Sequence, residues 1–223
     1  MEINSVVFNE DCVEGMKRYA DKHFDLAVID PPYGINRDAK QNKNKGKWGF
    51  KQYHHTEWDN KTPDSDYWNE LFRVSKNQII WGANHFISKI PFDSPCWIFW
   101  DKVGEGFDFA DGELAWTSFK TAVRRFTYAR GNDKGFAPKL KGIDRAGINI
   151  HPTQKPVFLY DWCLSRYAKQ GDLILDTHLG SGSSRIAAHK AGLDFTGFEL
   201  DTEYYLQQEK RFKLYKSQLT LTF

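Results

Sequence analysis

Short apolar runs that alternate with helical patterns restrict the fold of this chain more than any other feature. Strands are predicted at Ser5–Phe8, Leu26–Ile29, Gln78–Trp81, Trp97–Trp100, Leu114–Thr117, Leu173–Leu175 and Phe195–Phe198. Helices are predicted at Cys12–Tyr19, Ser65–Ser75, Val157–Ala168, Ser183–Ala191 and Thr202–Leu214. This alternation predicts an α/β fold with a mostly parallel sheet covered on both faces. The fourth and fifth runs have no helical pattern between them, which predicts an antiparallel pair at one edge.

Length and charge limit the classes of protein further. The 223 residues suffice for one α/β domain with an insertion, and a net charge of +2 means that any nucleic-acid surface must be local. The three cysteines are far apart and fit neither a disulfide framework nor a zinc cluster. The N-terminal residues include acids and no long apolar run, so we expect neither a secretory leader nor a membrane span, and a cytoplasmic location.

The second apolar run ends in Asp30-Pro31-Pro32-Tyr33. Two prolines remove two N–H donors and force the backbone out of the sheet, at the edge where open α/β sheets bind ligands. A carboxylate and a carbonyl at this point can accept both hydrogens of an exocyclic amino group, and the tyrosine ring can stack on the base that carries it. Taken alone, the tetrapeptide is also compatible with a plain turn after a strand.

A second group of residues follows the run Leu173–Leu175. Asp176 leads into a loop with Gly180 and Gly182, a helical pattern comes next, and the following strand ends in Glu199, 23 residues after Asp176. This is a nucleotide-binding βαβ pattern in which the second acid can accept ribose hydroxyls. Arg185 breaks the dinucleotide fingerprint, and Asp176 disfavours a pyrophosphate, so S-adenosylmethionine fits better than NAD.

Two basic stretches interrupt the alternation. Residues 37–51 contain six lysines or arginines and one acid, and residues 120–145 contain eight and two. Basic side chains interleaved with aromatic ones suit phosphates and unstacked bases, although such stretches can also be solvated loops. The predicted DNA-binding residues are Arg37, Lys40, Lys43, Lys45, Lys47, Lys51, Arg124, Arg125, Arg130, Lys139 and Lys141.

Taken in order, Asp30–Tyr33, His151–Pro156 and Asp176–Gly182 with Glu199 resemble the β arrangement of DNA amino-methyltransferases, in particular compact phage-like and prophage-like members. In that family the catalytic tetrapeptide precedes the cofactor motif, a circular permutation of the usual order. The resemblance implies a Rossmann-like methyltransferase fold with a seven-stranded, mostly parallel sheet and an antiparallel edge hairpin. It also implies one domain over 1–223, with basic DNA-facing insertions at about 36–60 and 118–150.

The resemblance assigns roles to individual residues. Asp30 and the Pro31 carbonyl would hold the target amine, with Pro32 and Tyr33 completing the catalytic tetrapeptide. The implied S-adenosylmethionine site comprises Asp11, Cys12, Asp30, Thr153, Lys155, Asp176, Leu179, Gly180, Ser181, Gly182, Ser183, Glu199 and Leu200. Thr177-His178 departs from the Pro-Phe that is frequent in the family at that point, and His178 could replace a packing aromatic there.

The expected reaction is direct methyl transfer to N6 of adenine in double-stranded DNA after base flipping, with no metal required and no covalent enzyme intermediate. N4 of cytosine is the alternative acceptor, and Asp30 favours adenine because the cytosine enzymes often carry serine there. An NAD-dependent oxidoreductase, an inactive nucleic-acid-binding module, and RNA or protein as the acceptor are further alternatives. A homodimer and a partner restriction enzyme are left open.

Overall fold

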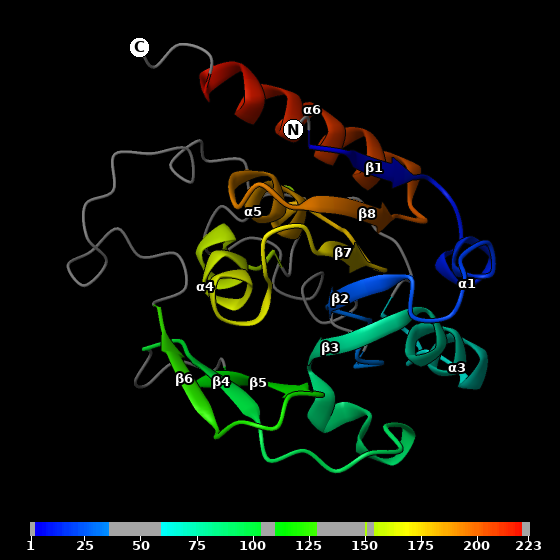
Figure 1. Ribbon diagram of the computed structural model, residues 1–223, viewed down its shortest axis with the longest axis vertical. Helices are drawn as coiled ribbons and strands as arrows, with labels where there is room; N and C mark the ends of the chain where they lie inside the picture. Colours follow the sequence, from blue (N-terminus) through cyan, green and yellow to red (C-terminus); the bar gives the residue numbers. More distant parts are fainter. Residues whose placement is uncertain (1–2, 36–58, 104–109, 129–149, 151–153, 220–223) are drawn as a thin grey trace, which may run out of the picture.

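The apolar runs pair into one eight-stranded sheet in the computed structural model, which describes residues 3–35, 59–103, 110–128, 150 and 154–219 (Figure 1). The strands are β1 (Ser5–Phe8), β2 (Phe24–Ile29), β3 (Ser75–Trp81), β4 (Trp97–Asp101), β5 (Gly112–Thr117), β6 (Arg124–Thr127), β7 (Leu173–Asp176) and β8 (Asp194–Phe198). Their spatial order is β1-β8-β7-β2-β3-β5-β4-β6. Among these strands β5 alone runs against its neighbours, since it is antiparallel to both β3 and β4.

Helices connect the strands and cover both faces of the sheet. They are α1 (Cys12–Met16), α3 (Ser65–Val74), α4 (Val157–Tyr167), α5 (Ser183–Lys190) and α6 (Thr202–Leu219), with short 3-10 helices at Ala83–His85 and Ile87–Lys89. No helix in the described ranges is both long and apolar enough to cross a lipid bilayer.

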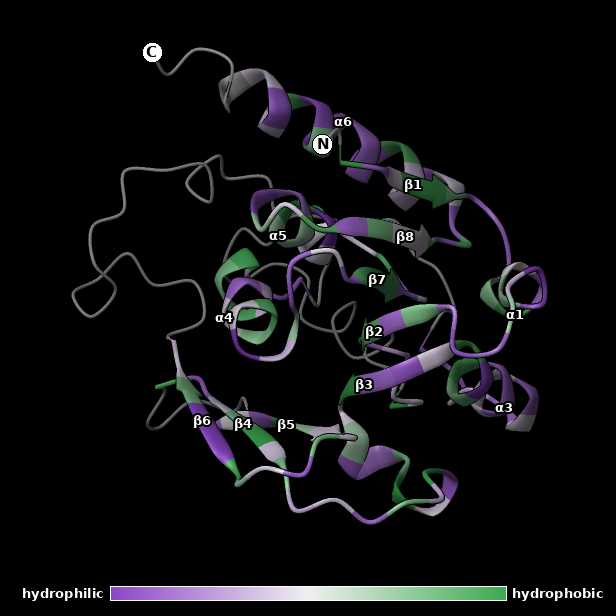
Figure 2. Cartoon of the chain, viewed as in Figure 1, coloured by the Kyte–Doolittle hydropathy of each residue, from purple (hydrophilic) through white to green (hydrophobic). Residues whose placement is uncertain are grey.

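Alternation along β2 divides the core into two layers. Leu26 and Val28 pack into a cluster with residues of α4, α5 and α6, whereas Ala27 and Ile29 pack into a second cluster with residues of α1 and α3. Successive side chains of a strand point to opposite faces, so one buried strand contributes to both layers. In Figure 1, α4 and α5 lie on one side of the central strands and α1 and α3 on the other, and Figure 2 shows hydrophobic and hydrophilic residues mixed along α6.

The expected fold class is confirmed, and the sheet has one strand more than the seven predicted. β6 was missed because Arg124, Arg125 and Thr127 surround a single apolar residue, Phe126, and this composition indicates a loop. The strand pairs in parallel with β4 at the outer edge of the sheet, where charged side chains are tolerated. The predicted β4–β5 antiparallel pair therefore exists, but β6 lies beyond it.

The predicted helices are all present, with different ends. The first is shorter than expected because the chain turns after Met16, and Lys22 adopts a left-handed conformation whose N–H binds the carbonyl of Arg73. The last continues to Leu219. Most of both predicted insertions, at residues 36–58 and 129–149, lies outside the described residues.

Arg185, which breaks the dinucleotide fingerprint, serves the core. Only 5% of the residue is exposed, and its guanidinium donates to Ser5 Oγ at 3.0 Å, to Gln208 Oε1 at 3.0 Å and to Glu209 Oε1 at 2.5 Å. It also lies over the ring of Phe212 at 3.9 Å from the centroid. One side chain of α5 thus joins the first strand to the last helix.

Replacement of Arg185 should therefore destabilise the whole domain. We expect Arg185→Ala to lower the free energy of unfolding by about 3 kcal/mol, because a buried polar network loses its only cation among these partners. The matched control is Lys190→Ala on the same helix, where a 52% exposed lysine pairs with Asp161 and should contribute about 0.5 kcal/mol or less. Urea denaturation measures both, and equal losses in the two variants would contradict the assignment.

Candidate active site

The site lies where the connections from two adjacent central strands diverge. β2 and β7 are parallel neighbours, with Leu26 opposite Ile174 and Ala27 opposite Leu175. The chain leaves β2 through α3 toward β3 on one side, and leaves β7 through α5 toward β8 on the other. Diverging connections of this kind open a crevice at the carboxyl ends of the strands, which is the usual ligand site of open α/β sheets.

A cavity of about 660 Å³ occupies this edge of the sheet. Its volume is within the range of pockets that enclose small organic ligands. The wall is built from the β1–α1 turn, the ends of β2, β7 and β8, the start of β5, and the start of α4. The lining residues include Glu10, Asp11, Cys12, Asp30, Pro31, Pro32, Tyr33, Glu113, Lys155, Tyr160, Leu179, Gly180, Ser181, Ser183, Glu199 and Leu200.

The structure brings together most of the site residues predicted from the sequence. All four residues of the tetrapeptide line the cavity, as do Asp11, Cys12, Lys155, Leu179, Gly180, Ser181, Ser183, Glu199 and Leu200. Thr153 lies outside the described residues. Asp176 and Gly182 are absent from the wall as far as the described residues define it.

Asp176 shapes the loop from behind the wall. It is 1% exposed and accepts hydrogen bonds from the backbone N–H of His178 at 3.1 Å and from Ser184 Oγ at 2.5 Å. Burial raises its pKa to about 7. Gly182 has φ +75° and is the N-cap residue of α5. The sequence pattern placed both residues in the right loop, but their contacts fix the loop instead of facing the cavity.

Glu199 connects the ends of β8 and β7 at the cavity wall. Its Oε2 accepts the N–H of Gly180 at 2.7 Å, and its Oε1 accepts the N–H of Asp201 at 2.9 Å. Burial raises its pKa to about 7, partly opposed by these two N–H groups. The carboxylate therefore titrates near neutral pH.

Asp30 is held by two donors at one oxygen. Lys155 Nζ lies 2.5 Å from Asp30 Oδ1, and the Tyr33 hydroxyl donates to the same oxygen at 2.6 Å. Lys155 Nζ also lies 3.0 Å from the Tyr33 hydroxyl oxygen. Both contacts use Oδ1, and no described residue donates a hydrogen bond to Oδ2. Lys155 is thus engaged with the tetrapeptide, whereas the sequence placed it near the end of a cofactor.

Glu113 is a site residue that the sequence analysis did not identify. One of its oxygens is 2.5 Å from Lys102 Nζ and the other is 3.0 Å from Lys155 Nζ. Burial alone would raise the pKa of Glu113, but the two lysines outweigh it and lower the pKa to about 2. A single acid at the start of a strand carries no motif, so only the antiparallel direction of β5 could have indicated its position.

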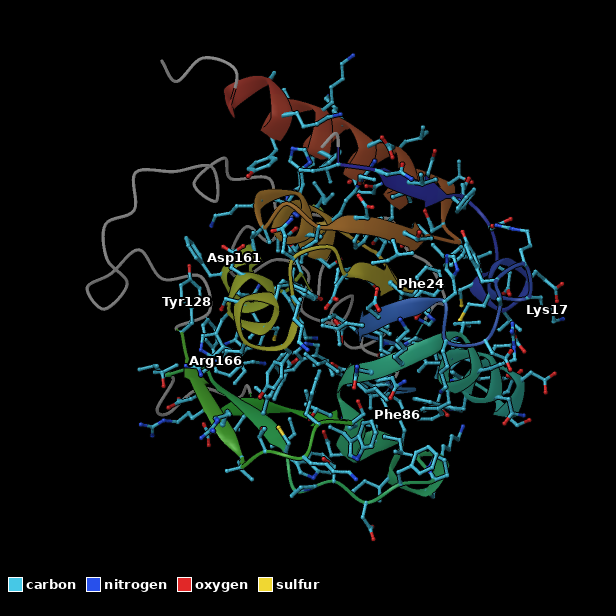
Figure 3. All side chains as sticks on the ribbon, in the orientation of Figure 1. Lys17, Phe24, Phe86, Tyr128, Asp161 and Arg166 are labelled. Atoms are coloured by element: carbon cyan, nitrogen blue, oxygen red, sulfur yellow. The ribbon has the colours of Figure 1, made fainter. Side chains whose placement is uncertain are left out.

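Tyr33 is fixed on several sides. Its N–H and that of Gly34 both bind Asp59 Oδ1, at 2.8 and 2.9 Å, which satisfies the first donors after the two prolines. His85 stacks on its ring with centroids 4.9 Å apart and planes inclined by 14°. Phe86, labelled in Figure 3, is buried and meets the same ring edge-on. The ring therefore has one face covered by His85.

Three further residues of the wall, His178, Cys12 and Asp11, are uncharged or cap a helix. His178 lies against Thr177 at 2.9 Å and Tyr67 at 5.2 Å between ring centroids, and burial lowers its pKa to about 4. Cys12 stays a thiol because burial and then the charge of Asp11 raise its pKa to about 12. Asp11 accepts the N–H groups of Val13 and Glu14 and so caps α1.

Of the predicted DNA-binding residues, the structure describes Arg124 and Arg125, which are exposed on β6. As neighbours in a strand they point to opposite faces, so the two do not form one patch. The others, Arg37, Lys40, Lys43, Lys45, Lys47, Lys51, Arg130, Lys139 and Lys141, lie outside the described residues.

Comparison with known proteins gives a family match over most of the chain. The model of the N6_N4_Mtase family, described as DNA methylase, matches residues 80–210. The type II methyltransferase M2.LlaDCHI of Lactococcus lactis subsp. cremoris is 22% identical over 93% of this chain and 89% of its own length. M2.DpnII of Streptococcus pneumoniae is 39% identical over 61 residues, which are 27% of this chain and 23% of that protein.

Solved structures agree on the fold. The cytosine-N4-specific PvuII DNA methyltransferase superposes with a TM-score of 0.62 at 15% identity, over 94% of this chain and 86% of that one. The complex of M1.HpyAVI with S-adenosylmethionine gives a TM-score of 0.56 at 20% identity, over 93% and 99% of the two chains.

The position of Tyr33 depends on Gly82. A Cβ at Gly82 would lie 2.1 Å from Cε1 of Tyr33, and the backbone there has φ +67°. We expect Gly82→Ala to destabilise the protein by about 1 kcal/mol of backbone strain plus about 1–3 kcal/mol of overlap.

Gly192→Ala separates the two contributions. Gly192 has φ +72°, but a Cβ there would come no closer than 3.7 Å to another atom, so this variant should show the strain alone. Guanidinium denaturation gives both values. A Gly82→Ala variant as stable as Gly192→Ala would show that the tyrosine ring is not held where the structure places it.

Proposed function

The chain belongs to the N6/N4 DNA methylase family and is an S-adenosylmethionine-dependent DNA methyltransferase, and we propose that it methylates N6 of adenine in double-stranded DNA. The observation that carries the proposal is the position of Asp30 and Pro31 in the wall of the same cavity as the Gly180 loop. An acceptor pair for an amino group and a nucleoside-binding loop thus share one cavity.

The charges of the cavity suit a cationic cofactor. Seven acids and one lysine are found among its described lining residues, the acids being Glu10, Asp11, Asp30, Asp59, Glu113, Glu199 and Asp201. A pyrophosphate would be repelled here, which argues against the alternative of an NAD-dependent oxidoreductase. S-adenosylmethionine supplies an electrophilic methyl group on a sulfonium and also carries an ammonium group, so its positive charges complement this wall.

We assign the ends of the cofactor to opposite parts of the wall. Glu199, at the end of β8, would accept the ribose hydroxyls, as acids at this point of a βαβ unit do. The backbone at Gly180 would approach the cofactor closely, and Asp11, Cys12 and Leu200 would lie around its base. Lys155 is assigned to the tetrapeptide and not to the cofactor, because its ammonium is paired with Asp30 and Glu113.

Asp30 and Pro31 would activate the amino group of the target. The lone pair of an exocyclic amine is delocalised into its base, and hydrogen bonds from both N–H groups favour a more pyramidal nitrogen whose lone pair points at the methyl carbon. Asp30 Oδ2 would accept one hydrogen and the Pro31 carbonyl the other. Such contacts strengthen as positive charge develops on nitrogen, so they stabilise the transition state more than the ground state. Asp30 then accepts the proton that the methylated amine loses.

Tyr33 would stack on the extruded base. His85 covers one face of its ring, so the base takes the other face. A pre-fixed ring offsets part of the few kcal/mol needed to unstack a base from the duplex. The contribution of the two basic stretches to DNA binding remains a prediction, as do a homodimer and a partner restriction enzyme.

Adenine is favoured over cytosine by the acid at position 30, since the resemblance associates serine there with the N4-cytosine enzymes. Cytosine N4 is the second candidate, supported by the fold likeness to the PvuII enzyme. Both bases present an exocyclic amine to the same acceptor pair, so the identity of the product distinguishes them.

Expression in a host that lacks DNA methylation should yield N6-methyladenine at one sequence motif, read by modification-sensitive sequencing. We expect Asp30→Ala to abolish the modification and to keep the affinity for S-adenosylmethionine within about threefold, because the acceptor is lost and the cofactor wall is intact. N4-methylcytosine would identify the second candidate, and no modified base with the wild-type chain would refute the proposal. Calorimetry on the purified variant provides the control for cofactor binding.

Cofactor affinity should fall at acid pH through Glu199. Its pKa of about 7 in the free protein must drop when its ionised form accepts ribose hydroxyls, so binding releases a proton and tightens as pH rises. We expect affinity about tenfold weaker at pH 6 than at pH 8. In the Glu199→Gln variant the ligand still titrates as it does with the wild type, but the carboxyl group is absent. This variant should therefore lose the part of the pH dependence of cofactor affinity that comes from Glu199. An identical pH profile in both proteins, by calorimetry, would exclude Glu199 from the ribose site.

A further inference from the structure

Four charges, two buried and two partly buried, alternate in sign beside the tetrapeptide. The chain of contacts runs from Lys102 to Glu113 at 2.5 Å, to Lys155 at 3.0 Å, and to Asp30 at 2.5 Å. The side chains of Lys102, Glu113, Lys155 and Asp30 are 9%, 18%, 3% and 17% exposed. Two positive and two negative charges cancel, so the cluster adds no net charge to the site. Each internal charge has an opposite charge on both sides.

The reversed direction of β5 brings Glu113 into this cluster. β3 ends at Trp81 near the site, and β5 pairs with it in antiparallel fashion, so the beginning of β5 lies where β3 ends. The bond from the N–H of Gly82 to the carbonyl of Leu114 fixes this alignment at 2.9 Å. Glu113 therefore meets Lys155, which precedes α4 and lies 42 residues later in the sequence.

Glu113 divides the ammonium of Lys155 between two carboxylates. Burial alone would lower the pKa of Lys155, but Asp30 and Glu113 raise it, so the lysine stays charged. If Glu113 were neutral, Asp30 would be the one carboxylate left to this ammonium within the described cluster. The lysine would then move fully onto Asp30 and compete for the oxygen that a target amine needs.

We propose that Glu113 is a positioning residue for methyl transfer, which acts through Lys155 to keep one oxygen of Asp30 open to the target amine. This inference rests on the proposed role of Asp30 as the amine acceptor. The same arrangement also accounts for the fate of the proton that the target amine loses. When the nitrogen–methyl bond has formed and the sulfonium has taken the bonding electron pair, the amine proton passes to Asp30 Oδ2. Lys155 then keeps Glu113 as a counter-ion that it shares with Lys102, and the cluster carries one extra positive charge until the proton leaves Asp30.

Replacement of Glu113 by glutamine should affect catalysis and the titration of Asp30 together. We expect the single-turnover rate of DNA methylation by Glu113→Gln to fall roughly 10- to 100-fold through misplacement of Lys155. The affinity for S-adenosylmethionine should stay within about threefold of wild type, since Glu199 and the Gly180 loop are unchanged.

The carboxyl carbon resonance of Asp30, in protein labelled with ¹³C-aspartate, gives a readout that does not need methylation. The groups that face Asp30 are Lys155, Glu113, Tyr33, Tyr160 of α4 and Asp176 of β7. Loss of the Glu113 charge removes its repulsion of the Asp30 carboxylate. It also leaves Asp30 as the one carboxylate partner of Lys155 within the described cluster. Both effects lower the pKa of Asp30, and we expect a shift of about one unit to lower pH.

Glu70→Gln is the matched control. Glu70 has the same 18% exposure and the same kind of ion pair, with Arg73 at 2.7 Å, but it lies on α3 away from the cavity. This variant should leave the methylation rate and the Asp30 titration as in wild type.

The outcomes separate this inference from the proposed function. An unchanged Asp30 titration in Glu113→Gln, or a methylation rate equal to that of Glu70→Gln, would overturn the role of Glu113. Activity that survives in Asp30→Ala would instead remove the proposed acceptor, and this inference with it. A lowered Asp30 pKa together with a slowed rate at retained cofactor affinity supports it.

Discussion

The parallel pairing of β2 with β7 is the constraint on which the rest of the structure depends. Two pairs of residues, Leu26 with Ile174 and Ala27 with Leu175, align strands that are almost 150 positions apart in the sequence. Their ends carry the tetrapeptide and the glycine loop to one edge of the sheet. The chain leaves them in opposite directions, so no connection fills the space between them. The cavity is the consequence of this divergence.

Carboxylates at this edge are used in two different ways. Glu199 and Asp176 are held by backbone or hydroxyl donors without a cation at close range in the described contacts, and burial brings their pKa values near 7. Glu113 has a lysine at each oxygen and remains ionised down to about pH 2. Glu199 in the wall and Asp176 behind it can therefore respond to the charge of a bound cofactor, whereas Glu113 beside the tetrapeptide keeps its charge.

Periodicity in the sequence was sufficient to predict the strands with strong apolar character, and the order of the motifs could be read directly from the sequence. Periodicity did not predict β6, because an edge strand needs few apolar residues and Arg124–Thr127 contains a single one. Asp59 and Glu113 could not be found, since each contacts a partner that is distant in the sequence and that only the folded chain brings near. Asp176 was assigned to the right loop, but whether it faces the ligand or supports the loop depends on burial that a motif does not encode.

The edge strand β1 pairs with β8, with Ser5 opposite Phe195 and Phe8 opposite Phe198. During synthesis on the ribosome, β1 can therefore pair only once β8, the last of the described strands, has been made. The turn that carries Asp11 and Cys12 to the cavity follows β1 directly, so the cofactor cleft is completed only after β8 has been synthesised. Contacts of such long sequence separation also slow folding. A nascent chain thus presents its Asp-Pro-Pro-Tyr segment well before it has a cleft that can bind a methyl donor.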